Sequence, residues 1–121
     1  MVKPTILLKR IYDEPASTDG VRFLVDRLWP RGISKERARL DAWLKEAAPS
    51  DELRRRYHHQ AELWTEFRER YFKELDANPK ALDPIREALK RGPVTLLFAA
   101  KNAELNNAAA LRDYLLEHPT K

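Results

Sequence analysis

An aspartate and two arginines gather at the end of one short apolar segment. Asp26 and Arg27 directly follow the run Phe23-Leu24-Val25, and Arg31 lies in the next turn, which contains proline and glycine. Arginine guanidinium groups bind phosphate and carboxylate oxygens through paired hydrogen bonds. A neighbouring carboxylate can orient an arginine or act as a base. The segment therefore predicts an anion site held by Arg27 and Arg31, with Asp26 as the candidate catalytic group.

A second polar group follows the apolar stretch 94–100. Lys101 and Asn102 come next, and Asn106 and Asn107 lie in the first turns of the last predicted helix. The free N–H groups and the positive dipole end of a helix start favour an anion. Ligands in open α/β sheets bind beyond the carboxyl ends of the strands, so we expect the two polar groups to share one pocket.

Both groups also have a purely structural interpretation. Asp26 could form an ion pair with one of the nearby arginines and only fix the loop. Lys101-Asn102 could be a simple helix cap. Asn106 and Asn107 are poor helix formers, so they either bind the preceding loop or line a pocket.

Three other groups of residues do not predict a functional site. His58 and Glu62 are one helical turn apart, but no third ligand lies near them, so we expect no metal. Ser50 lacks the glycine-flanked elbow of a nucleophile and is assigned to capping a helix. The three glycines of the chain are isolated. This excludes a glycine-rich phosphate loop, and no cofactor is indicated.

The spacing of aromatic residues predicts a long amphipathic helix over 62–76. Trp64, Phe67 and Tyr71 recur at helical intervals with Leu63 and Leu75, and charged residues lie between them. Aromatic and basic residues together can also stack on nucleic acid, but this spacing favours a role in the core.

The remaining elements follow from apolar runs, caps and helix breakers. Strands are predicted at 5–12, 21–28 and 94–99, and the segment 43–46 is either a helical turn or a short strand. Shorter helices are predicted after Ser34 and Ser50 and over 80–91, and Asn102 caps or precedes a last helix that extends to Glu117. This order indicates an α/β fold, a small three-layer structure whose mostly parallel sheet is flanked by helices, in a single domain spanning 1–121.

Composition limits the functional classes. The net charge of +4 favours an anionic partner, although acidic residues are interspersed with the basic ones. Nucleic acid is therefore the alternative partner, bound through the basic surface. Cysteine is absent and no apolar run is long enough to span a membrane. We expect a cytoplasmic protein without membrane contact.

The chain resembles the YeaO-like family of bacterial proteins, within the DUF488 group. The resemblance is carried by 9–13, by Asp19-Gly20, by the specific motif 24–32, and by weaker matches through Asn106-Asn107-Ala108. It implies a small cytoplasmic α/β domain without an established activity. Longer relatives carry Cys-His-Arg at positions 106–108, and close relatives often have histidine at Leu105 and aspartate at Asn102. These departures imply ligand binding at the last helix in preference to proton transfer.

Together these observations predict a domain that binds a small phosphate- or carboxylate-bearing ligand at the carboxyl edge of its sheet. The residues named above are expected to contact this ligand directly. Three further residues are expected at the outside of the site: Arg10, Tyr12 and His59.

Overall fold

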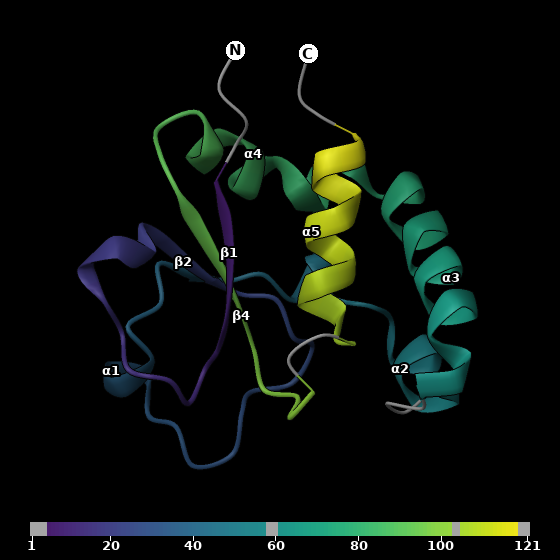
Figure 1. Ribbon diagram of the computed structural model, residues 1–121, viewed down its shortest axis with the longest axis horizontal. Coiled ribbons are helices and arrows are strands. Elements are labelled where there is room, and N and C mark those ends of the chain that lie inside the picture. Colours follow the sequence, from purple (N-terminus) through teal and green to yellow (C-terminus); the bar gives the residue numbers. More distant parts are fainter. Residues whose placement is uncertain (1–4, 58–60, 103–104, 119–121) are drawn as a thin grey trace.

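The computed structural model describes residues 5–57, 61–102 and 105–118. Within this part of the chain, four strands form one sheet in the order β1-β4-β2-β3, and every neighbouring pair is parallel (Figure 1). The strands are β1 Ile6–Arg10, β2 Val21–Leu24, β3 Ala42–Trp43 and β4 Val94–Phe98. The predicted α/β fold with a parallel sheet flanked by helices is confirmed, and the ambiguous segment 43–46 begins with the last residue of a short strand.

The central strand β4 separates two apolar cores. All five of its residues are buried, as its continuous apolar sequence predicts for a strand covered on both faces. Val94, Leu96 and Phe98 belong to the larger core, and Leu97 belongs to the smaller one with Leu24. This alternation follows from the two-residue period of a strand, which directs successive side chains to opposite faces.

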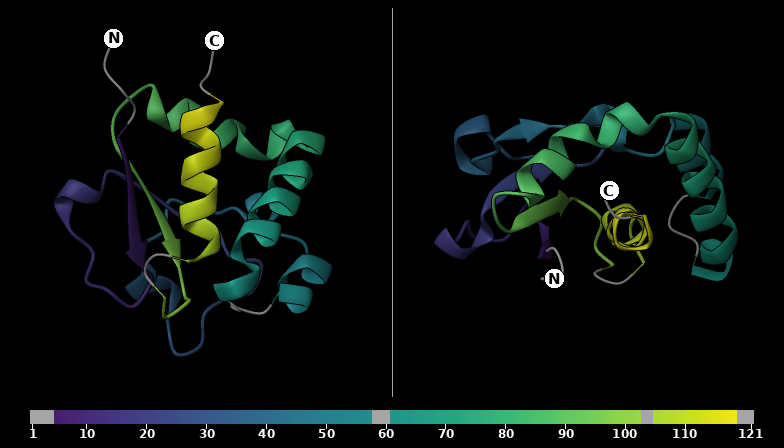
Figure 2. Two further views of the ribbon diagram at one scale, coloured as in Figure 1. Left: turned by 45° about the vertical axis from the view of Figure 1, so that its right-hand side comes forward. Right: turned by 90° about the horizontal axis from the view of Figure 1, so that it is seen from above.

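Most of the helices contribute to the larger core. Figures 1 and 2 show α5 running back along the sheet from the edge where the strands end, with α3 on its far side. Short α1 contributes Ala38 to the smaller core. The helices are α1 Lys35–Ala38, α2 Asp51–Tyr57, α3 Trp64–Ala77, α4 Asp83–Leu89 and α5 Asn107–Glu117.

Two predicted helix caps are confirmed. The Ser34 hydroxyl accepts a hydrogen bond from the Arg37 backbone N–H at 3.1 Å. The Ser50 hydroxyl accepts one from the Leu53 N–H at 3.1 Å and donates to Glu74 at 2.6 Å. Each serine therefore satisfies an N–H that the first helical turn leaves without a partner.

Two predicted boundaries were wrong by three or more residues. The strand expected over 21–28 ends at Leu24, although the Val25 N–H still donates to Leu97. The helix expected over 80–91 begins only at Asp83, because Pro84 has no N–H for a bond to the preceding turn. The last helix begins at Asn107, so of the two roles expected for Asn102 the structure shows that it precedes the helix and does not cap it. Asn106 has an extended backbone and caps α5 by accepting from the Ala109 N–H at 2.8 Å.

A buried ionic cluster fixes the start of β2. Asp19 and Arg22 are 4% and 5% exposed, and their side chains form an ion pair. Lys9 on β1 lies 3.2 Å from the same carboxylate. The Arg22 guanidinium also donates to the carbonyls of Ala38 and Arg39. Arg22 is thereby bound to Asp19 and to the end of α1.

We expect Asp19→Asn to lower the free energy of unfolding by about 3 kcal/mol, because it leaves the buried Arg22 guanidinium without its counter-charge. Urea unfolding measures this value. Glu87→Gln is the control, since it removes an exposed ion pair with Lys90 and should cost less than about 1 kcal/mol. Equal losses in the two variants would contradict a structural role for the cluster.

The same carboxylate should make stability depend on pH. Burial raises the pKa of Asp19, but hydrogen bonds from Ala16, Lys9 and Arg22 outweigh it and hold the pKa below its ordinary value of 3.8. Because the pKa is lower in the folded state, this stabilisation is complete above the ordinary value and is lost as the pH falls through the folded pKa. Urea unfolding across this acid range should show the difference between wild type and Asp19→Asn shrinking. A difference that does not change with pH would contradict the assignment.

Candidate functional site

A cavity of about 400 Å³ opens at the carboxyl edge of the sheet. Its wall combines residues that follow β1, β2 and β4 with residues of α2, α3 and the start of α5. A cavity of this size can enclose a small organic ligand. The lining residues are Tyr12, Asp26, Arg27, Leu28, Trp29, Pro30, Arg31, Pro49, Arg54, Tyr57, Trp64, Phe67, Ala99, Ala100, Leu105, Asn106 and Asn107.

Asp26 joins three segments of the chain at this edge. One carboxylate oxygen accepts a hydrogen bond from the Ala99 N–H at 2.9 Å, and the other accepts from the Asn107 side-chain amide at 3.0 Å. The Asp26 carbonyl accepts from the indole of Trp43 at 2.7 Å. The aspartate thus holds the ends of β2 and β4 against the start of α5.

Arg27 contributes positive charge to the cavity while it braces a loop. Its Nε and one terminal nitrogen donate to the carbonyls of Pro49 and Ala48, each at 3.2 Å. These bonds fix the loop that precedes α2.

Arg31 reaches the cavity from an exposed turn. Its backbone carbonyl accepts a hydrogen bond from the Tyr12 hydroxyl at 2.9 Å, which ties the turn to the end of β1. Its side chain is exposed and lines the cavity. Arg31 therefore combines a fixed backbone with an accessible charge.

Asn106 and Asn107 serve the helix start in different ways. The buried Asn106 caps α5 and donates to the Asn102 carbonyl at 3.0 Å. Asn107 uses its amide to bind Asp26 and also the Val25 carbonyl at 2.8 Å. Both residues line the cavity, so the positive dipole end of α5 faces it.

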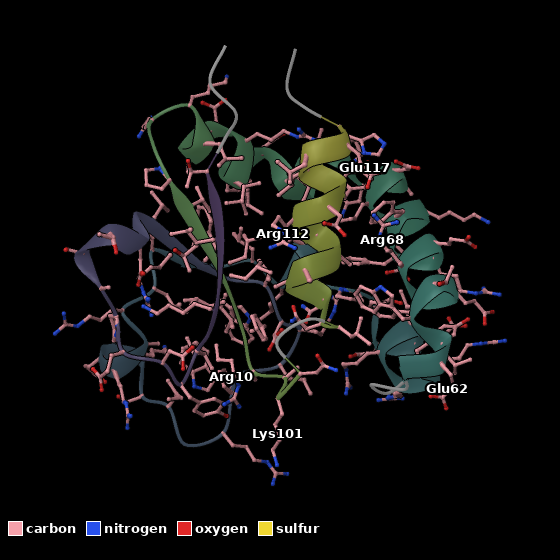
Figure 3. The ribbon with its side chains drawn as sticks, viewed as in Figure 1. Arg10, Glu62, Arg68, Lys101, Arg112 and Glu117 are labelled. Atoms are coloured by element: carbon pink, nitrogen blue, oxygen red, sulfur yellow. The ribbon has the colours of Figure 1, made fainter. Side chains whose placement is uncertain are left out.

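The other predicted site residues lie outside the cavity lining. Arg10 donates to the carbonyls of Ala100 and Ala99 at 3.0 and 3.2 Å and fixes the end of β4. Figure 3 shows Arg10 and Lys101 at the same edge of the molecule, and Lys101 is exposed. Asn102 accepts a hydrogen bond from the Leu105 N–H at 2.9 Å.

The predicted outer ligand His59 lies outside the described residues, as does His58 of the discarded metal hypothesis. Glu62, the other member of that hypothesis, is exposed (Figure 3). Within 5–57, 61–102 and 105–118, no group of three histidine or acidic side chains is arranged to hold a metal ion.

Sequence reasoning missed the part of the cavity wall that α2 and α3 form. Arg54 and Tyr57 of α2 and Trp64 and Phe67 of α3 all line it. Helical periodicity assigned Trp64 and Phe67 to the core, and both pack against the larger core as well as lining the cavity. Their half-buried state is explained by their place in the first turn of α3, beside the edge where the strands end.

One buried hydroxyl close to these charges stays protonated. Burial raises the pKa of Tyr71, and the negative charges of Glu74 and Asp26 raise it further, against the opposite effect of Arg27. The Tyr71 hydroxyl donates a hydrogen bond to the Ala47 carbonyl. This bond supports the loop that also accepts from Arg27.

The fold and the cavity define a small parallel α/β domain with an arginine-lined cavity at the carboxyl edge of its sheet. The chain belongs to the family described as the inactive DUF488-N3 subclade, whose model matches residues 5–121. The recognised resemblance to YeaO-like proteins is thereby confirmed.

Curated relatives are similar along almost their whole length. The uncharacterized protein YeaO of Escherichia coli is 44% identical over 110 residues, which cover 91% of this chain and 96% of the relative. The uncharacterized protein Rv3073c of Mycobacterium tuberculosis is 41% identical over 116 residues, covering 95% and 98% of the two chains. No solved structure matches the chain. In the described part, no helix is long and apolar enough to cross a membrane.

We expect the bond between Asp26 and Asn107 to appear in a double-mutant cycle. Asp26→Ala should lower the free energy of unfolding by about 2 kcal/mol, because it leaves two donors without an acceptor. Its coupling to Asn107→Ala should be about 1 kcal/mol, measured by urea unfolding. Glu87→Ala with Asn107→Ala is the control and should be additive. Additivity in the test pair would contradict the brace.

Proposed function

We propose that this domain binds a small anionic ligand, bearing a phosphate or carboxylate, in the cavity at the carboxyl edge of the sheet. The observation that carries the proposal is the convergence of three guanidinium-bearing side chains, Arg27, Arg31 and Arg54, on one cavity with the start of α5. A site of this kind favours an anion through charge, through planar donors and through the helix dipole.

The cavity lining also contains one carboxylate, which is already hydrogen-bonded within the protein. Asp26 is the only acidic residue among the described lining residues, and both of its oxygens accept hydrogen bonds from protein donors. The lining therefore carries more positive than negative charge. Arg27 donates to two carbonyls, and Arg54 lies 3.4 Å from the carboxylate of Asp51. The exposed Arg31 is therefore the arginine best placed to bind an entering anion.

The same arrangement favours binding over catalysis. The Asp26 carboxylate is occupied in holding Ala99 and Asn107 in place, so its use as a base would compete with the fold. The description of the family as an inactive subclade agrees with this proposal. We therefore assign Asp26 to positioning, and Arg31 and Arg54 to the ligand, with Arg27 adding charge.

Thermal unfolding in the presence of inorganic phosphate, pyrophosphate, citrate and AMP tests the proposal. A ligand at 100 times its Kd stabilises the folded state by about 2.7 kcal/mol, so at least one of these anions should raise the Tm. Arg31→Gln should weaken that anion by about tenfold, since a charge-assisted hydrogen bond is lost. Added NaCl should weaken binding by screening.

Arg37→Gln is the matched control. Arg37 is an exposed arginine of α1 outside the cavity lining, so its replacement should leave the ligand response unchanged. Arg27→Ala is a poorer test because it also frees the loop carbonyls of Ala48 and Pro49. The proposal fails if none of the anions raises the Tm of wild type more than that of Arg31→Gln.

A further inference from the structure

One wall of the cavity is aromatic, and anion binding does not account for it. The rings of Trp64 and Phe67 are stacked with centroids 5.7 Å apart and planes 24° apart. Tyr57 meets Phe67 edge-on, with centroids 6.2 Å apart. Trp64 and Phe67 remain half-buried where they line the cavity. A planar ring placed against this wall would bury the remaining aromatic surface in an offset or edge-to-face contact.

Two buried donors lie in the same wall. Tyr57 is only 3% exposed, yet its hydroxyl has no hydrogen-bond partner at satisfactory geometry in the described part of the chain, and neither has the Nε of Arg54. The hydroxyl is close enough to Glu66 to lower the pKa of that acid, without forming a well-aligned bond to it. Buried polar atoms without partners are rare and costly, so these two positions favour a ligand that supplies acceptors.

The two features lie in the cavity that also contains Arg31. The aromatic wall and the two unpartnered donors come from α2 and from the first turn of α3, whereas Arg31 comes from the turn after β2. The volume of about 400 Å³ is enough for one ligand that contacts both groups. Such a ligand needs an aromatic ring, hydrogen-bond acceptors on the ring and an anionic group.

We propose that the ligand is a heteroaromatic anion, whose ring packs beside Trp64 and Phe67 and accepts hydrogen bonds from Tyr57 and Arg54. Its anionic group is bound by Arg31. This inference rests on the proposed function, because it names the class of anion that the same cavity takes. It adds a ring subsite formed by α2 and α3, which simple phosphate or acetate would leave empty.

Pairs of probes that differ in the ring test this subsite. AMP and UMP are compared with ribose 5-phosphate, and pyridine-3-acetate, whose ring nitrogen accepts a hydrogen bond, is compared with acetate, by NMR titration of the ¹⁵N-labelled full chain. At least one ring-bearing anion should bind about tenfold tighter than its ring-free counterpart. It should also shift the NMR resonance of the Trp64 indole N–H. The indole of Trp43, which is outside the lining and bound to the Asp26 carbonyl, is the internal reference.

Two substitutions separate the ring from the anion. Tyr57→Phe should weaken the best ring-bearing anion by about fivefold, because one hydrogen bond is lost, and leave its ring-free counterpart unchanged. Tyr114→Phe is the matched control, since that hydroxyl is bound to Asp76 away from the cavity. Arg54→Gln should weaken the same ligand, whereas Arg55→Gln, which alters an exposed neighbour outside the lining, should not.

The possible failures are distinguishable. If ring-bearing and ring-free anions bind equally well and Arg31→Gln weakens both, the ring subsite is wrong and the anion site stands. If Tyr57→Phe has no more effect than Tyr114→Phe, with both variants folded by circular dichroism, the role of the hydroxyl is wrong. If no probe of either kind binds, the proposed function and the ring subsite are both overturned.

Discussion

The carboxylate of Asp26 is the constraint on which the cavity depends. It accepts hydrogen bonds from Ala99 and from Asn107, which are 73 and 81 positions away in the sequence. A hydrogen bond to a charged acceptor is stronger than a neutral one, and this acceptor satisfies a backbone group that follows the central strand. The ends of β2 and β4 and the start of α5 are therefore fixed by one side chain. The other residues of the cavity are placed relative to that junction.

The arginines of this chain perform two kinds of work that composition does not distinguish. Arg10, Arg22 and Arg27 donate to backbone carbonyls and hold segments together inside or at the edge of the fold. Arg31 and Arg54 line the cavity without such carbonyl bonds in the described residues, and Arg54 lies 3.4 Å from the carboxylate of Asp51. A planar guanidinium suits both purposes because its five donors can cap carbonyls as well as bind anions. Net charge alone therefore overstates how much positive surface a partner meets.

Most of the fold could be predicted because it depends on short stretches of sequence. The features that could not be predicted depend on contacts between distant segments. Ser34 and Ser50 were identified as caps because a cap depends on a few adjacent residues. The cap of α5 was left open because Asn102 and Asn106 both have side chains that can cap, and only the packed structure selects between them. Part of the cavity lining was predicted, because the end of an apolar strand in the sequence locates Asp26, Arg27 and Arg31. Trp64 and Phe67 were missed because helical spacing is the same for a core and for a cavity wall.

The order β1-β4-β2-β3 has a consequence for the newly made chain. Within the described residues, β1 pairs only with β4. Ile6 therefore has no neighbour in the sheet until Val94 has been synthesised. Until then β2 has only the two-residue strand β3 beside it. Pairing between such distant segments is slow, and the apolar strands are exposed meanwhile. Because β4 pairs with both β1 and β2, the sheet can be completed only after most of the chain has been synthesised.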